Sequence, residues 1–180
     1  AGAVILDPEC HIPGLADSKT ITAAERDRLH DLITRKALAW SVAWADPEEI
    51  DTINIHQASL QAMRRAVLAI APLPDLVLVD AFRIPALDIA QRGVLHGDRR
   101  CAAIAAASIV AKVTRGRQMM GHHERDPGYG YDRHKGYATA EHRAAVERYG
   151  YSPLHRRSFR PQGHLFDTMD LDLPNPVDPA

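Results

Sequence analysis

The chain has 180 residues, of which 46% are hydrophobic and 25% charged, and its formal net charge at pH 7 is −1. This composition excludes a chain that is disordered throughout and, because no uncharged apolar run approaches the roughly 20 residues that cross a bilayer, it predicts no membrane segment. Two cysteines are too few for a disulfide framework and fit a reducing compartment, so we expect a cytoplasmic protein.

The N-terminal part alternates predicted strands and helices. An apolar run at residues 3–7 ends in Asp-Pro and predicts a strand. It starts abruptly and without Met, so we expect the chain to have been cut from a longer one. The capping box of Thr22 and Glu25 predicts a helix over residues 22–36. Alternating Trp and Val side chains predict a strand within residues 38–45.

Two helix starts and a third strand follow. Asp46, followed by Pro and two acids, predicts a short helix, and Asn54 opens the next one, which ends before Pro72. Residues 76–80 are a wholly apolar run ending in Asp80. Such a run predicts a strand that is buried on both faces.

The C-terminal half is predicted to be mainly helical. Residues 99–120 form a long helix that is apolar almost all round, and residues 126–131 form a loop. Residues 139–149 predict another helix, with inward side chains at Ala140, Ala144 and Val146. Strands interleaved with helices predict the α/β class, with helices packed on a sheet.

The charge is unevenly distributed. Residues 96–164 hold 13 Lys or Arg but only 6 Asp or Glu, a local charge of +7 against −8 in the rest of the chain. This polarity is typical of a polyanion-binding face, although a solvent-exposed basic surface is the alternative.

Several side chains are candidates for binding or catalysis. Asp80 ends a strand where α/β proteins place ligands, or else it caps a turn. Lys112 shares one face of the long helix with Gly116, where it could contact a phosphate or only extend to solvent. His134-Lys135-Gly136-Tyr137 combines basic and aromatic side chains, with Tyr129 and Tyr131 close in sequence. Such a mixture suits phosphate binding and stacking on a sugar or base.

The chain contains a series of motifs in a fixed order: AGAVILDP, IPGLADSK, DPEEIDTINIHQASLQAMRRA, LVLVDAFRIP, GDRRCAAIAAASIVAKVTR, PGYGYDRHKGYAT and YGYSPLHRRSF. In this order and spacing the chain resembles ribonuclease HII, the type 2 ribonuclease H, over about residues 1–160. The resemblance implies an α/β fold with a ribonuclease H-like mixed sheet flanked by helices and a C-terminal helical appendage. We therefore expect a core at 1–120, a substrate-binding helical region at 121–160 and an acidic, Pro-rich tail at 161–180.

The same resemblance implies an activity. The family cleaves the RNA strand of RNA–DNA hybrids and incises duplex DNA 5′ to an embedded ribonucleotide, with Mg²⁺ or Mn²⁺ as the cofactor. The implied partner is a hybrid or a ribonucleotide-containing duplex, bound by a monomer.

Individual roles are implied by matching positions. Asp80 falls on a catalytic metal-binding Asp, and Tyr137 falls on the Tyr that meets the sugar at the RNA–DNA junction. Four further positions fall in phosphate-side motifs: Lys19, Lys112, His134 and Lys135.

Two departures concern the metal site. The family carries four acids, and two of them, an Asp-Glu pair followed by Gly-Arg-Gly, would lie on a strand before Ala1. The fourth is expected in the Thr-Arg-Asp-Arg string, where this chain has Gly116, although Asp98 could help. Two interpretations stay open: a ribonuclease HII whose first strand is missing from this sequence, or a non-catalytic homologue that binds nucleic acid. We expect the 180 residues alone to be inactive.

Overall fold

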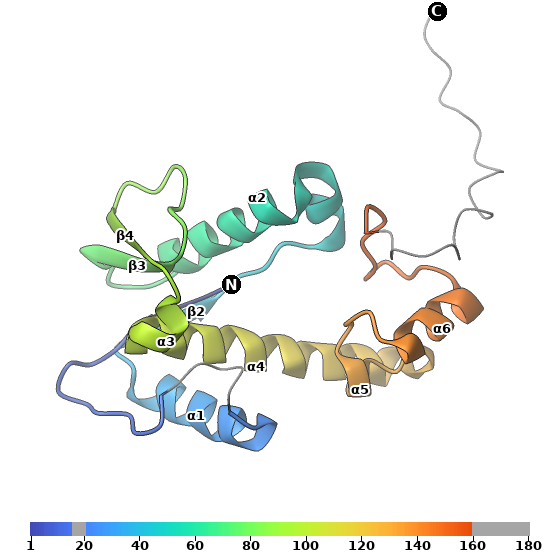
Figure 1. Ribbon diagram of the computed structural model, residues 1–180, viewed down its shortest axis with the longest axis horizontal. Coiled ribbons are helices and arrows are strands. Elements are labelled where there is room, and N and C mark those ends of the chain that lie inside the picture. The colour runs from blue at the N-terminus through green and yellow to red at the C-terminus, as the bar shows by residue number, and fades with distance from the viewer. Residues whose placement is uncertain (16–20, 160–180) are drawn as a thin grey trace, which may run out of the picture.

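The computed structural model describes residues 1–15 and 21–159. Figure 1 shows one long helix, α4 (Ala102–Arg125), crossing the molecule, with the other elements arranged along it. Helix α1 (Ala23–Lys36) and the first strands pack against its first half, and short helices pack against its second half. Within the described residues no helix is long and apolar enough to cross a membrane.

The strands in the described part of the chain form two small sheets. β1 (Gly2–Ile5) pairs antiparallel with β2 (Ala39–Val42), and β3 (Leu76–Asp80) pairs parallel with β4 (Ala90–Val94). The strands at 3–7, 38–45 and 76–80 are therefore confirmed, with shorter bounds for the first two. The class is mixed α/β, as expected.

The prediction that β3 is buried on both faces is wrong. Val77 and Val79 are buried, whereas Leu76 is 52% and Leu78 36% exposed. The two valines pack in a cluster with Val67, Ile84 and Leu87, which covers one face of the two-stranded sheet. The described residues leave the other face largely open, so an unbroken apolar run does not here mean two covered faces.

The early helices begin at the predicted caps. The hydroxyl of Thr22 accepts a hydrogen bond from Glu25 N at 3.2 Å and opens α1. Both starts predicted at Asp46 and Asn54 occur within α2 (Pro47–Leu68). Asn54 breaks this helix with φ 68° and ψ 161°, and its side chain then caps the second segment.

Helix α4 lies at the centre of the main core. Its residues Ala106, Ile109 and Val110 are fully buried against Leu29 and Ile33 of α1. It begins at Ala102 rather than Arg99, because a separate turn, α3 (Gly97–Arg100), precedes it and Cys101 is extended. Gly2 brings β1 close to α4, since a Cβ there would lie 2.6 Å from the Ala107 carbonyl oxygen.

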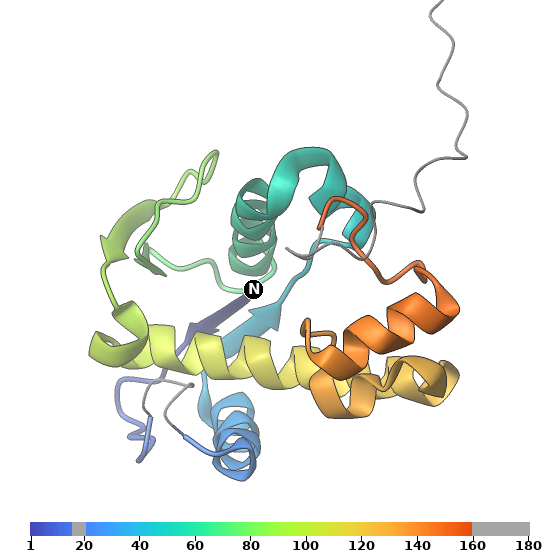
Figure 2. The ribbon, with the colours of Figure 1, turned by 45° about the vertical axis from the view of Figure 1, so that its right-hand side comes forward.

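The C-terminal elements form a lobe on the second half of α4. They are a 3₁₀ turn, η1 (Pro127–Tyr129), α5 (Tyr131–His134) and α6 (Ala140–Tyr149), so the predicted loop at 126–131 is partly helical. α5 and η1 pack against α4, and α6 packs on η1 and α5; Figure 2 shows the segment after α6 returning towards α2. There the Asp51 carboxylate accepts hydrogen bonds from the backbone N–H groups of Arg157 and Ser158.

The predicted inward face of α6 is partly wrong. Val146 is buried, but Ala140 and Ala144 are exposed, and the second buried position is His142. The side chains four residues apart, His142 and Val146, share the inner face.

Candidate functional site

The first part of the site lies at the carboxyl end of β3. Asp80 is the last residue of this strand, and its Oδ1 accepts a hydrogen bond from the backbone N–H of Gly97 at 2.8 Å. A Cβ at Gly97 would lie 2.5 Å from Ile104 Cδ1 and 3.4 Å from Asp80 Oδ1. A side chain at position 97 would therefore require the Ile104 side chain to shift, and glycine avoids this crowding beside the carboxylate.

A second carboxylate follows immediately. Asp98 is the residue after Gly97 and is 8% exposed, so a buried acid lies one residue from the N–H that holds Asp80. Consecutive Cα atoms are about 3.8 Å apart. We call Asp80, Gly97 and Asp98 the acid edge.

The acid edge has the right chemistry for a hard divalent cation. Mg²⁺ takes oxygen ligands and is commonly bound through one or two carboxylates, with water and substrate phosphates completing its shell. Asp80 and Asp98 supply carboxylates of this kind. The described residues hold no cluster of three or more His, Cys, Asp or Glu side chains that could bind a metal by itself.

The structure does not place position 116 at the acid edge. Gly97 packs against Ile104 in the first turn of α4, and Gly116 lies twelve residues further along that helix, about 18 Å by the helical rise. A carboxylate at 116 is too far away to share an ion with Asp80. The expectation that Gly116 occupies the position of a missing metal ligand is therefore corrected, and the neighbouring acid in this structure is Asp98.

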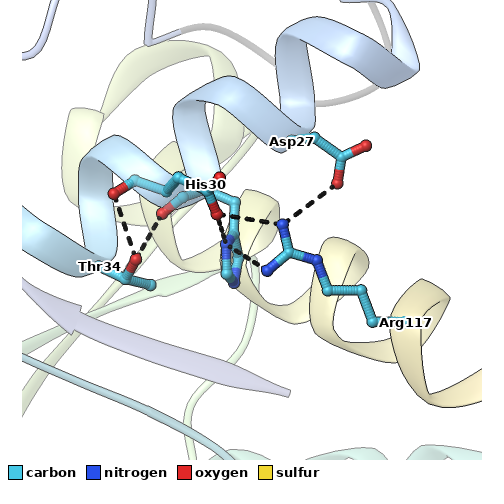
Figure 3. A network of polar contacts seen from close by, with 5 residues as sticks. Asp27, His30, Thr34 and Arg117 are labelled. Carbon is cyan, nitrogen blue, oxygen red and sulfur yellow. Dashed lines mark hydrogen bonds and ion pairs between the residues drawn. The ribbon is translucent and has the colours of Figure 1, made fainter.

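The two arginines beside Gly116 serve different faces of α4. The guanidinium of Arg115 lies over the ring of Tyr137, 5.2 Å from its centroid. Arg117 reaches α1, where it lies 3.1 Å from Asp31 Oδ1 and 3.6 Å from Asp27 Oδ1 (Figure 3). Hydrogen bonds from His30 and then Arg117 lower the pKa of the Asp31 carboxyl.

The second part of the site is the turn that carries Tyr137. Lys135 and Gly136 have positive φ values of 51° and 77°, which reverse the chain between α5 and α6. The Tyr137 N–H donates to the His134 carbonyl at 2.9 Å. Its side chain is 60% exposed beside Arg115. The turn therefore presents an aromatic ring next to a cation.

The residues predicted to contact phosphates differ in their burial and in their hydrogen-bond partners. Lys135 Nζ donates to the Asp132 carbonyl at 2.5 Å and lies 2.6 Å from Met120 Sδ. His134 is buried, and its ring bonds to the Tyr129 carbonyl and the Gly136 N–H. Lys112 lies half-buried on α4, and Lys19 lies outside the described residues.

Tyr129 and Tyr131 do not offer stacking surfaces. Both rings are buried and stack on each other, with centroids 5.5 Å apart. Burial raises the pKa of both hydroxyls. These tyrosines form the core of the C-terminal lobe, which corrects the expectation that they lie beside Tyr137 as ligand-binding rings.

Sequence reasoning missed two histidines, His142 and His155, that connect to the backbone of Tyr137 through hydrogen bonds. His142 Nδ1 lies 3.0 Å from the Tyr137 carbonyl oxygen, and His142 Nε2 lies 3.0 Å from His155 Nε2. The available signal was the four-residue spacing of His142 and Val146 on one helix, which fits a shared buried face.

Comparisons with known proteins agree over most of the chain. The family model of ribonuclease HII matches residues 3–162. The chain is 52% identical to a ribonuclease HII of Ralstonia nicotianae over 170 residues, 93% of this chain and 72% of that protein. It is 55% identical to a ribonuclease HII of Paracidovorax citrulli over 161 residues, 89% of this chain and 67% of that protein.

Two archaeal structures share the fold. The crystal structure of ribonuclease H2 from Pyrococcus horikoshii has a TM-score of 0.66 at 22% identity and covers 81% of this chain and 77% of its own. Ribonuclease HII in a PCNA complex from Archaeoglobus fulgidus also has a TM-score of 0.66, at 21% identity, covering 86% of this chain and 82% of its own.

Proposed function

The chain belongs to the ribonuclease HII family, and from that membership we propose that it acts on RNA–DNA hybrids and on duplex DNA carrying single ribonucleotides, incised on the 5′ side. The membership gives the general activity, an endonuclease of the ribonuclease H type. Substrate reading at the junction and the assignment of individual residues are our proposal.

The observation that carries the proposal is the exposed Tyr137 on the basic C-terminal lobe. Its ring is 60% exposed, lies beside the Arg115 guanidinium and projects from a turn whose backbone is fixed by hydrogen bonds. In this role the ring packs against the sugar that follows the ribonucleotide, while Lys135 and Lys112 contact phosphates. Phosphate contacts position a duplex, and the ring contributes the selectivity. His134 supports the turn from inside.

Asp80 and Asp98 are the residues that would hold Mg²⁺ or Mn²⁺. When bound, such an ion polarises a phosphoryl oxygen and activates a water nucleophile. Gly97 orients the Asp80 carboxylate through its N–H, so that Asp80 needs little rearrangement to become a ligand. The Asp-Glu strand that the resemblance implies would supply the other carboxylates.

A non-catalytic binder is the second candidate. It is favoured by the small number of carboxylates at the acid edge, because two acids hold Mg²⁺ more weakly than four would. This candidate predicts binding of the same nucleic acids without cleavage, even when further acids are provided.

The deciding experiment adds the implied strand to the chain. A fusion that places an Asp-Glu and Gly-Arg-Gly strand before Ala1 is incubated with a duplex carrying one ribonucleotide and with an all-DNA duplex of the same sequence. We expect Mn²⁺- or Mg²⁺-dependent cleavage 5′ to the ribonucleotide and no cleavage of the all-DNA control. A folded fusion that binds the duplex but never cuts it would favour the second candidate.

The 180-residue chain itself provides a binding test. We expect it to bind RNA–DNA hybrid with an affinity that falls steeply with salt, because neutralised phosphates release counterions. An affinity independent of salt, or no binding at low salt, would remove nucleic acid from the proposal.

A further inference from the structure

A cluster of three histidines lies behind the Tyr137 turn. His134 ends α5, His142 lies on α6, and His155 lies in the segment after α6. The rings of His134 and His142 stack with centroids 4.4 Å apart and an interplanar angle of 14°. No catalytic or phosphate-binding role in the proposed function needs the last two.

The hydrogen bonds fix where each proton resides. His155 Nδ1 lies 2.9 Å from the backbone N–H of Ser152, which can only donate, so Nδ1 accepts and the ring proton is on Nε2. That N–H faces His142 Nε2 at 3.0 Å, which must therefore accept. The proton of His142 is then on Nδ1, where it donates to the Tyr137 carbonyl at 3.0 Å.

The result is a directional chain of bonds from Ser152 through two neutral imidazoles to the backbone of Tyr137. The segment at its origin is itself held, since the Asp51 carboxylate accepts from the backbone N–H groups of Arg157 and Ser158, two and three residues beyond His155. His134 fixes the other side of the turn: its Nδ1 accepts from Gly136 N at 3.2 Å and its Nε2 donates to the Tyr129 carbonyl at 2.7 Å.

We propose that His142, oriented by His155, is a positioning residue for Tyr137: its Nδ1–H holds the Tyr137 carbonyl so that the ring is presented to the substrate. This inference rests on the proposed role of Tyr137 and adds a structural relay that the role requires. The Tyr137 carbonyl also accepts from Thr139 N at 2.8 Å, so the relay adds to this carbonyl a second hydrogen bond, which through His155 is anchored outside the turn.

Both imidazoles have to stay neutral for the relay to exist. A second proton on His142 would set two N–H groups against each other at the Nε2–Nε2 contact, and one on His155 would face the Ser152 N–H. Burial lowers the pKa of both rings. The titratable groups around the two rings are His134, Tyr129, Tyr131, Tyr151 and, by its charge, Asp126.

Two substitutions at one position separate hydrogen bonding from packing. His142→Phe keeps an aromatic ring against His134 but removes the Nδ1 donor. His142→Asn loses most of the ring but keeps an amide N–H that reaches about as far as Nδ1. His122→Phe, on α4 outside the cluster, is the matched control.

The first readouts use the full chain without nucleic acid. Nitrogen-15 NMR at pH 7.5 should show His142 protonated on Nδ1, and His134 and His155 protonated on Nε2. Trypsin should cut after Lys135 at least threefold faster in His142→Phe than in wild type, with His142→Asn and His122→Phe within about twofold of wild type. Equal protection of Lys135 in His142→Phe, or a His142 ring protonated on Nε2, would overturn the proposal.

The second readout is a double-mutant cycle in the strand fusion described above. If His142 acts through Tyr137, His142→Phe lowers cleavage at a single ribonucleotide in wild type but causes no further loss in the Tyr137→Ala background. Equal losses in both backgrounds would overturn the proposal. If the fusion never cleaves, the proposed function fails, and the tautomers and the trypsin rates decide the relay by themselves. If His142→Phe does not fold, the wild-type tautomers and the Asn variant still decide it.

Discussion

The acid edge and the Tyr137 turn both depend on hydrogen bonds that fix one residue, but the turn has more of these bonds. In both, hydrogen bonds hold the residue in question: the backbone N–H of Gly97 donates to the Asp80 carboxylate, and the His134 carbonyl and the His142 imidazole bond to the Tyr137 backbone. The turn belongs to a closed network in which the donors and acceptors of the three histidines match. At the acid edge, the contact between the Gly97 N–H and the Asp80 carboxylate is a single hydrogen bond of 2.8 Å. In the proposed function, the turn that reads the substrate is therefore held by more hydrogen bonds within this chain than the carboxylate that would bind the metal ion.

The largest expected effect is the loss of cleavage when a carboxylate of the acid edge is replaced. In the strand fusion, Asp80→Asn should lower cleavage at least 100-fold, about 2.7 kcal/mol, because an amide lacks the charge that holds a divalent cation. The same change should weaken Mn²⁺ binding in a calorimetric titration and leave the circular dichroism spectrum unchanged. Asp98→Asn should have an effect of the same direction.

Asp88→Asn, on the exposed loop between β3 and β4, is the control. It removes the same charge in the same part of the sequence and should leave cleavage within about twofold. Full activity of Asp80→Asn would mean that the metal lies elsewhere.

The order of elements was predictable from local signals. The caps at Thr22, Asp46 and Asn54 predicted three helix starts, since each side chain satisfies N–H groups that its own helix leaves unpaired. β4 was missed, because its sequence, Ala-Gln-Arg-Gly-Val, has neither an apolar run nor clear alternation. It forms because it pairs with β3, a partner that local sequence does not reveal.

The sequence could suggest single candidate residues of the site. It could not predict the distances between them or their burial. Asp80 and Tyr137 were proposed from their positions and from the resemblance, and their roles stay predictions. The separation of Gly116 from Asp80 and the burial of Tyr129 and Tyr131 depend on how α4 and the lobe pack, which no sequence motif encodes. The histidine relay joins residues 13 apart with no shared motif.

The next effect tests the Tyr137 turn. In the fusion, Tyr137→Ala should lower cleavage at a single ribonucleotide at least tenfold, about 1.4 kcal/mol, while duplex affinity changes much less because the basic side chains remain. Tyr137→Phe, which keeps the ring, should retain most of the activity. Cleavage and affinity are measured on the same duplex. Equal losses in both would make Tyr137 an ordinary binding contact.

A smaller effect is a pH dependence of the stability of the Tyr137 turn, which comes from His142 and His155. Burial lowers the pKa of His142 and His155 below the ordinary value of about 6.5, so the unfolded chain binds more protons than the folded chain in mildly acidic solution. The stability contributed by the neutral rings is fully present above pH 6.5 and is lost as the pH falls through 6.5 towards the folded pKa values. The thermal midpoint should therefore fall between pH 7.5 and 5.5, and fall less in His142→Asn. Equal falls in both proteins would contradict this account.

The smallest effect concerns Gly116, which belongs to neither region. A Cβ built there has no heavy atom within 4 Å, apart from its chain neighbours and the helix's own backbone. Gly116→Ala should therefore stabilise the chain by about 0.5–1 kcal/mol, because glycine is a poor helix former, and raise the thermal midpoint by about 1–4 °C. Gly116→Asp in the fusion should leave Mn²⁺ affinity and cleavage within about twofold, since its carboxylate lies far along α4 from Asp80. Urea unfolding of the first variant and calorimetry of the second provide the measurements. A clear gain in Mn²⁺ affinity with Gly116→Asp would bring position 116 back to the acid edge and contradict the placement of Asp98 as the neighbour of Asp80.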